Sequence, residues 1–243
     1  MYSDKFHFEE GLNYRIFHIT KPITQSNSDI AIIPYPCLIY CSEGSAKINY
    51  NNSTYTIHKD SVLCVFSNTT FQATDISDDL QSSVILFSND LIIDSTIGFK
   101  AEYLSNIFAH PYKPLTDECN KQIFHNLFST LDAYEDCKSR FDRSTDFVYG
   151  IIRCMLIALA EMSKQENKLN TSSNNSFSTT DNYFRDFLKL LSDNCKTQHN
   201  VAFYADKLCI TPKYLNEICR KKMKKTAKEV ITRAVIAQIK NAL

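Results

Sequence analysis

The sequence predicts an α+β protein in which an N-terminal antiparallel β-barrel is followed by helices and then by a C-terminal all-α unit. Up to residue 91, short apolar runs alternate with turn residues, as in antiparallel strands. From Thr116 onward, apolar residues recur with the helical period instead. The charge is also divided: residues 1–180 hold 14 Lys and Arg against 21 Asp and Glu, whereas residues 181–243 hold 13 against 6. A basic C-terminal part therefore follows an acidic body, although the net charge is zero.

The β-rich domain is expected at residues 1–110. Its turns are predicted at Glu43-Gly44, at Lys59-Asp60 and at Asn51-Asn52, a hairpin tip, because Asn tolerates positive φ better than other non-glycine residues. Close spacing of short strands favours a barrel or a sandwich. The expected strands are Ile30–Ile33, Cys37–Cys41, Ala46–Tyr50, Tyr55–Ile57, Val62–Phe66 and Val84–Phe87.

Residues 111–163 are expected to form a pair of helices. The second begins near Ser144-Thr145-Asp146, which suit a helix N-cap. Its apolar residues occupy more than one side, so two of its sides must be covered. The barrel covers one side, and either the first helix or the partner subunit of a homodimer covers the other. The apolar residues are Ile123, Leu127, Phe128, Leu131 and Tyr134 in the first helix, and Phe147, Val148, Ile151, Ile152, Met155, Leu156 and Leu159 in the second.

A polar linker is predicted at residues 164–181, where Ser, Thr, Asn and charged residues prevail. An all-α unit follows at residues 182–243. Its first helix has one apolar face, because its apolar residues fall at i, i+3, i+4 and i+7. These residues are Phe184, Phe187, Leu188 and Leu191.

The next two helices have the spacing of a helix-turn-helix. A short helix carries the small residue Ala205, where two helices can cross closely, and a tight turn follows at Cys209. A new helix starts at Thr211-Pro212, because Thr is a favoured N-cap and Pro is tolerated at the first helical position. Leu215 and Ile218 then face inward, and long polar side chains occupy the other face.

This polar face has the chemistry to contact DNA, since the major groove admits an α-helix. Asn216 could pair with adenine, Lys213 or Arg220 with guanine, and Glu217 with the amino group of cytosine. We predict these four residues as base contacts. The alternative is a small helical bundle with a solvated basic loop. The predicted phosphate contacts are the lysines that follow, namely Lys221, Lys222, Lys224, Lys225 and Lys228.

The segment VAFYADKLCITPKYLNEICRKKMKKTAKEVI, with its Tyr214-Leu215 pair and with Lys240 beyond it, resembles the first helix-turn-helix of AraC-type transcription regulators. The resemblance covers about 60 C-terminal residues. It implies a cytoplasmic, sequence-specific DNA-binding regulator whose β-rich half is a cupin-like sensing domain, with helices used for dimerisation. Double-stranded DNA is the expected partner. The barrel either holds a small-molecule effector or is filled by its own side chains.

Two departures from the family pattern matter. The family has glycine where this chain has Cys209 and Lys224, so both turns must tolerate a side chain at a cost of about 1 kcal/mol each if φ is positive. The family also continues into a second helix-turn-helix, whereas this chain stops at Leu243, so we expect a truncated DNA reader. The alternative function is a sensor or competitor, binding a ligand or a partner, that does not bind DNA stably by itself.

Enzymatic and membrane functions are not expected. No GxSxG, P-loop, GxGxxG or HExxH pattern is present. His58 is the only histidine between residues 30 and 91, where the barrel strands are predicted, and it lacks an HxH partner, so neither a catalytic residue, nor a metal ligand, nor a cofactor is predicted. No apolar run is long enough to span a bilayer, and the N-terminus does not read as a secretory signal. The nine scattered cysteines are expected to be mostly reduced and buried.

Overall fold

The chain forms two compact units in a computed structural model that describes residues 13–20, 30–50, 53–67, 69–96, 107, 110–137, 144–169 and 179–242. The first unit comprises residues 1–91 and 111–158, and the second comprises residues 92–110 and 159–243. Each unit has its own cluster of buried apolar residues. None of the helices in these ranges is long and apolar enough to cross a membrane.

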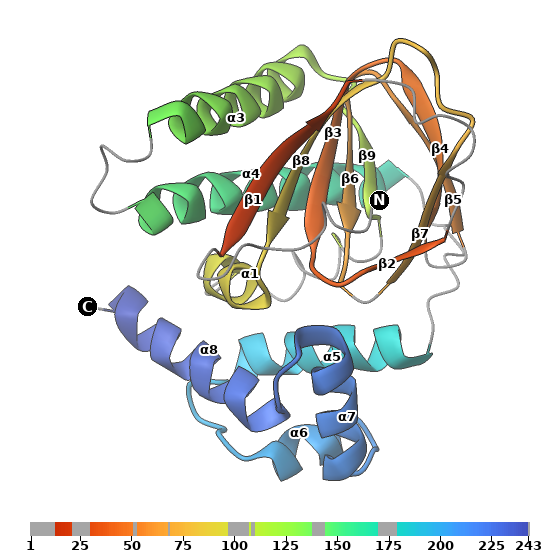
Figure 1. The fold of residues 1–243 in the computed structure, drawn as a ribbon. Coiled ribbons are helices and arrows are strands. Elements are labelled where there is room, and N and C mark those ends of the chain that lie inside the picture. The colour runs from red at the N-terminus through yellow and green to blue at the C-terminus, as the bar shows by residue number, and fades with distance from the viewer. Residues whose placement is uncertain are drawn as a thin grey trace. The chain divides into compact units, whose positions relative to one another are not determined.

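Two antiparallel sheets form the body of the first unit (Figure 1). One has the strand order β1-β8-β3-β6-β9, and the other has the order β2-β7-β4-β5. The strands of the first sheet are β1 (Tyr14–Ile19), β3 (Cys37–Glu43), β6 (Ser61–Val65), β8 (Gln81–Phe87) and β9 (Tyr112–Pro114). Those of the second are β2 (Ala31–Ile33), β4 (Ser45–Tyr50), β5 (Ser53–His58) and β7 (Thr69–Thr74).

No ladder joins the two sheets among the described strands, so the prediction of a closed barrel is corrected to two separate sheets. The edge strands β5 and β9 meet through side chains, with the rings of Tyr55 and Tyr112 6.3 Å apart. Strand β9 is only three residues long and ends at Pro114, which has no N–H to donate. A short strand that ends in proline cannot continue one sheet into the other.

The core of the first unit lies between the two sheets. Alternate residues of each strand point to the same face, so every second residue of β3, β6 and β8 contributes to it. The buried members are Ile33, Cys37, Ile39, Cys41, Ala46, Ile48, Tyr50, Ile57, Leu63, Val65, Leu80, Val84 and Leu86.

The other face of the five-stranded sheet is buried as well, beneath helix α3 (Glu118–Cys137) and the part of helix α4 (Ser144–Leu169) that belongs to the first unit, up to residue 158. The rings of Tyr40 and Phe128 stack there, 5.2 Å apart. Burial on both faces explains why β3 and β6 read as continuous apolar runs. Helix α4 starts at Ser144, as predicted. In the first turns of α3, Phe124 is buried instead of the predicted Ile123, which is 37% exposed.

The turns predicted at Glu43-Gly44 and Lys59-Asp60 are confirmed and lie side by side. Gly44 and Asp60 have φ values of 74° and 59°. The Lys59 N–H donates to the Gly44 carbonyl at 2.9 Å, and the Lys59 ammonium lies 2.7 Å from a Glu43 carboxylate oxygen. The predicted tip Asn51-Asn52 lies outside the described residues, although Tyr50 and Ser53 pair on either side of it.

Strands β1, β7 and β9 were not predicted from the sequence. Strand β1 carries Arg15 and His18 among its apolar residues, and β7 (TTFQAT) is largely polar and only partly buried. The helices also extend further than expected, since α4 runs to Leu169 and α5 (Thr179–Asn194) begins within the predicted linker. Residues 170–178 of that linker lie outside the described residues.

The second unit is helical. It contains α5, α6 (Val201–Lys207), α7 (Pro212–Met223), α8 (Ala227–Ala242) and the ends of α1 (Asn89–Thr96) and α4, within which the boundaries between the units fall. Its core was largely predicted, because the expected apolar positions of α5 and α7 are buried there, except Leu188, which is partly buried and packs against the core. The core residues are Phe184, Phe187, Leu191, Cys195, Tyr204, Ala205, Leu215, Ile218, Cys219, Met223, Ala227, Val230 and Ile231.

Free thiols occur in both units. Burial raises the pKa of the Cys64 and Cys219 thiols to about 12, so both stay protonated at neutral pH. The buried thiols are Cys37, Cys41, Cys64, Cys195 and Cys219, and the exposed ones are Cys119, Cys154 and Cys209.

Candidate nucleic-acid interface

Helix α6 and the turn after it follow the pattern predicted from the sequence. The Asn200 side chain caps α6 by accepting the Ala202 N–H at 3.0 Å. Ala205 is fully buried where the two helices meet. Cys209 then adopts a left-handed conformation with φ of 55°, and the Ile210 N–H returns to the Ala205 carbonyl at 3.0 Å. The chain therefore turns within the four residues 208–211 that separate α6 from α7.

Helix α7 begins and ends at the predicted signals. Thr211 is its N-cap and accepts the Tyr214 N–H at 3.1 Å, and Pro212 occupies the first turn, where its missing N–H would have no partner. At the other end Lys224 takes the left-handed conformation, with φ of 56°, and donates its N–H to the Arg220 carbonyl at 3.0 Å. Cys209 and Lys224, where the family has glycine, thus both have positive φ.

Helix α8 starts with a capping box that the sequence analysis missed. The Glu229 carboxylate accepts the Thr226 N–H at 2.6 Å and the Thr226 hydroxyl at 2.7 Å. The Glu229 N–H in turn donates to the Thr226 hydroxyl oxygen at 3.3 Å. These hydrogen bonds hold the pKa of Glu229 below its ordinary value. The T-x-x-E spacing is a recognised signal of a helix start and could have predicted this cap.

The inward face of α7 packs on α5 and α6. Leu215, Ile218 and Cys219 are buried in the core of the unit. On the neighbouring helix Tyr204 is fully buried, meets the Phe187 ring edge-on at 5.6 Å, and donates its hydroxyl to the Gln198 carbonyl at 2.7 Å. This packing fixes which side of α7 is exposed.

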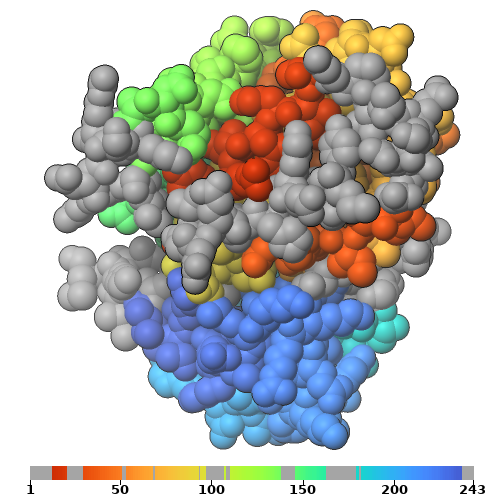
Figure 2. All heavy atoms as spheres, in the orientation of Figure 1, coloured from red at the N-terminus to blue at the C-terminus, as the bar shows by residue number. Residues whose placement is uncertain are grey.

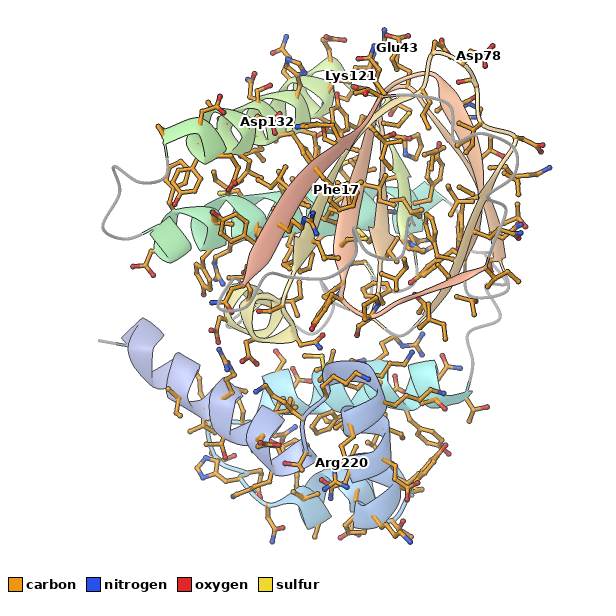
Figure 3. The ribbon with its side chains drawn as sticks, viewed as in Figure 1. Phe17, Glu43, Asp78, Lys121, Asp132 and Arg220 are labelled. Carbon is orange, nitrogen blue, oxygen red and sulfur yellow. The ribbon has the colours of Figure 1, made fainter. Side chains whose placement is uncertain are left out.

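The opposite face of α7 carries three of the four predicted base contacts. Lys213, Glu217 and Arg220 are exposed, and within the described residues their side chains form no hydrogen bond or ion pair. Their spacing of four and three residues places them on one side of the helix. Arg220 is labelled in Figure 3, and the space-filling view shows side chains of these C-terminal helices, in blue, at the surface (Figure 2).

Asn216, the fourth predicted base contact, is engaged within the protein. Its amide nitrogen donates to the Pro212 carbonyl at 3.0 Å, and its amide oxygen accepts the Ala227 N–H at 2.9 Å. The side chain is partly buried, and both of its polar atoms have partners. Asn216 therefore links α7 to α8 instead of extending from the exposed face.

The predicted phosphate contacts also differ in how far their side chains are exposed. Lys221, Lys224 and Lys228 are exposed, and Lys225 is partly exposed. The Lys228 ammonium donates to the His199 carbonyl at 3.2 Å, near the start of α6. Lys222 is only 7% exposed, because it lies four residues after Ile218 on the buried face of α7, and it is therefore removed from the candidate phosphate contacts.

Two further exposed residues, on α7 and α6, were not predicted as DNA contacts from the sequence. Tyr214, which is 36% exposed, follows Lys213 on α7 and meets the Tyr183 ring edge-on at 6.0 Å. Lys207 is exposed at the end of α6, with its ammonium 6.0 Å from the Phe203 ring centroid. The sequence marked Tyr214 only as part of the family pattern, since its exposure depends on how α5 packs.

The first unit contains a Ser-His-Asp set that the sequence did not predict. His18 Nδ1 lies 3.0 Å from the Ser83 hydroxyl, and His18 Nε2 lies 3.2 Å from a carboxylate oxygen of Asp132. Asp132 lies on α3 and is labelled in Figure 3. Acyl transfer also requires hydrogen-bond donors for an oxyanion, from backbone N–H groups or from polar side chains. Strand β8 is paired on both sides, by β1 and β3, so the backbone around Ser83 is already used in the sheet. The contact between His18 and Asp132 joins α3 to strand β1.

No metal site accompanies either unit: among the described residues, no three His, Cys, Asp or Glu side chains gather as a bound ion would require.

Several solved structures are similar to this chain. The AraC-like transcriptional activator CuxR aligns with 93% of this chain and 73% of its own, with a TM-score of 0.50 at 9% sequence identity. ToxT from Vibrio cholerae aligns with 95% of this chain and 84% of its own, with a TM-score of 0.42 at 15% identity. A cupin 2 conserved barrel domain protein from Leptotrichia buccalis aligns with 34% of this chain and 44% of its own, with a TM-score of 0.26 at 15% identity. No protein-family model and no curated protein matches this sequence. The likeness to CuxR is one of fold over most of the chain.

Proposed function

We propose that the chain is a DNA-binding transcription regulator of the AraC type, in which α7 reads the major groove. One observation carries the proposal: Lys213, Glu217 and Arg220 share the exposed face of a helix whose opposite face is buried and whose two ends are fixed by caps. A rigidly held helix with long polar side chains on one side is what groove reading requires. The fold shared with CuxR supports the same proposal.

The chemistry of the face suggests the role of each residue. The Arg220 guanidinium can donate two hydrogen bonds to the O6 and N7 of guanine, as the Lys213 ammonium also can. The Glu217 carboxylate can accept from the cytosine amino group. Lys221, Lys224, Lys225 and Lys228 would contact phosphates, which fixes the register of the helix without reading sequence.

The first unit is the sensing half in this proposal. We propose that a small-molecule effector binds to this unit, and that a homodimer contact lies on α3 and α4. No catalytic step forms part of the proposal. A cytoplasmic regulator with these parts would respond to its effector by changing its affinity for double-stranded DNA.

The test is a titration of the whole chain with duplex DNA of random sequence, followed by selection of the duplexes that bind best. Because phosphate contacts release counterions, the logarithm of the affinity should fall linearly with the logarithm of the salt concentration. Lys221→Ala and Lys225→Ala should each reduce this slope by about 1 and weaken all duplexes alike. Arg220→Ala should instead relax the preference at one base pair, at a cost of about 1–3 kcal/mol.

Lys47→Ala is the matched control, because Lys47 is an exposed lysine of β4 whose ammonium pairs with Asp75 at 3.2 Å. It should leave both the slope and the base preference unchanged. If the whole chain bound no duplex in a salt-dependent manner, the DNA proposal would fail. The alternative, a sensor or competitor that does not bind DNA stably by itself, would then be favoured.

A further inference from the structure

We propose that Asn216 is a positioning residue that fixes the angle between the reading helix α7 and the helix α8 that follows it. Its two polar atoms point in different directions: the amide nitrogen holds the Pro212 carbonyl in the first turn of α7, and the amide oxygen holds the Ala227 N–H in the first turn of α8. The positioning of a DNA-reading face rests on the proposed function, whereas the link between the helices does not.

The first turn of α8 shows why this contact matters. The first four N–H groups of a helix have no partner within the helix. In α8 the capping box satisfies the N–H of Glu229. Ala227 is fully buried, so its N–H has no access to bulk water and depends on the Asn216 oxygen.

The position of Asn216 on α7 makes the link relevant to the DNA-reading face. It is the neighbour of Glu217 in sequence and lies three residues after Lys213 and four before Arg220. A hydrogen bond from this point to α8 therefore sets the orientation of the exposed ridge relative to α8. Any displacement of the start of α8 must either break this hydrogen bond or turn α7 with it.

The link can be measured in the DNA-free chain. An amide in the first turn of a helix has no backbone acceptor within that helix. The protection of the Ala227 N–H from hydrogen exchange therefore reports its hydrogen bond to the Asn216 oxygen. Asn216→Ala should accelerate exchange of this amide about five- to tenfold, as expected for the loss of one hydrogen bond. Asn216→Asp should preserve the protection, because its carboxylate remains an acceptor and a negative charge is favoured at a helix N-terminus.

Glu217→Ala is the matched control for exchange, because Glu217 is the exposed neighbour and makes no hydrogen bond within the described residues. It should leave exchange at Ala227 unchanged. Unchanged exchange in Asn216→Ala, or loss of protection in Asn216→Asp, would overturn the link between the helices.

The positioning role is tested with the selected duplexes. Asn216→Ala should weaken all of them by a similar factor and leave the base preference intact, whereas Glu217→Ala should change the preference at one base pair. A change of preference at a single base pair in Asn216→Ala would instead make Asn216 a base contact and overturn the positioning role. If the unmodified chain bound no DNA, the proposed function and the positioning of a DNA-reading face would fail together, while the exchange result would still decide the link.

Discussion

Cys209 and Lys224 adopt the left-handed conformation without being glycine, at the turn before α7 and at its end. A side chain in this conformation brings its Cβ close to the following carbonyl oxygen, which costs about 1–2 kcal/mol. Glycine avoids this cost but loses more conformational freedom on folding. Replacing either residue by glycine should therefore raise the free energy of unfolding by less than the energy of the backbone strain that it removes.

We expect Cys209→Gly and Lys224→Gly each to raise the free energy of unfolding of the second unit, by about 0.5–1 kcal/mol. Urea unfolding followed by circular dichroism would measure the change. Glu217→Gly is the control within α7, where helical φ gives glycine no advantage, and it should lower stability by roughly 0.5 kcal/mol. Equal effects at all three positions would contradict the strain assigned to the turns.

Gly44 and Gly150 provide a contrasting pair in the first unit. At Gly44, where φ is 74°, an added Cβ would lie 2.6 Å from the Ser77 hydroxyl oxygen and 2.7 Å from the Leu80 Cα. At Gly150, within α4, an added Cβ would have no heavy atom within 4 Å. The same added methyl group therefore meets backbone at one site and open space at the other.

Gly44→Ala should destabilise the first unit by about 2–3 kcal/mol, through both the positive φ and the overlap with Leu80. Gly150→Ala should stabilise it by about 0.5–1 kcal/mol, because alanine favours the helix and restricts the unfolded chain. Thermal unfolding of the two variants and of the unmodified chain would measure both changes in stability. A stable Gly44→Ala variant would show that this turn does not have the conformation described.

At the scale of the element, α8 depends on the capping box at its start. The Glu229 carboxylate is hydrogen-bonded to Thr226, and its pKa is lowered when the chain is folded. A carboxyl whose folded pKa lies below its unfolded value adds stability above the unfolded pKa. That contribution is lost as the pH falls through the folded pKa. The stability of α8 should therefore depend on pH in the acidic range.

The pH dependence can be isolated with Glu229→Gln, which keeps a capping acceptor but does not titrate. At about pH 7 the unmodified chain should have a higher free energy of unfolding than Glu229→Gln. The difference should shrink at pH values below about 4.3, the ordinary pKa of Glu. Thr226→Ala should lower stability by about 1 kcal/mol at neutral pH. Urea unfolding at several pH values measures both effects, and an advantage over Gln that stayed constant with pH would contradict the assignment.

At the scale of the whole molecule, the helical unit includes a segment from the N-terminal half of the sequence. Residues 92–96 of α1 belong to it, although the sequence placed them in the β-rich domain. Ile92 packs against its core, and the Arg233 guanidinium of α8 forms two hydrogen bonds, of 2.7 and 2.5 Å, with the Asp94 carboxylate of α1. This bidentate pair joins residues 139 positions apart in the chain.

The Asp94–Arg233 pair should contribute measurably to the second unit, because its side chains are only 37% and 31% exposed and its geometry is bidentate. A double-mutant cycle with Asp94→Ala and Arg233→Ala should give a coupling energy of about 1 kcal/mol, and added salt should reduce it. Lys47 and Asp75, which are 46% and 73% exposed, are the control pair and should couple by no more than about 0.3 kcal/mol. Similar coupling in the two pairs would show that α1 does not hold α8.

Much of the fold could be predicted from the sequence because the signals are local. The Thr211-Pro212 helix start, the turn at Cys209 and the inward residues of α5 and α7 all depend on neighbours within one or two helical turns. The predicted strands β2, β3, β4, β5, β6 and β8 were found for the same reason. Strand β7 was missed because a polar, half-buried strand has no apolar alternation to reveal it.

The candidate site was predicted less completely. The exposed face of Lys213, Glu217 and Arg220 follows from helical periodicity, so the sequence by itself determined it. Only the tertiary structure decided that Asn216 is held by Ala227, that Lys222 is buried, that residues 92–96 join the helical unit, and that the two sheets stay separate. The physical reason is that periodicity and caps act between residues close in the chain. Burial and hydrogen bonding, in contrast, depend on which distant segments come to lie beside them.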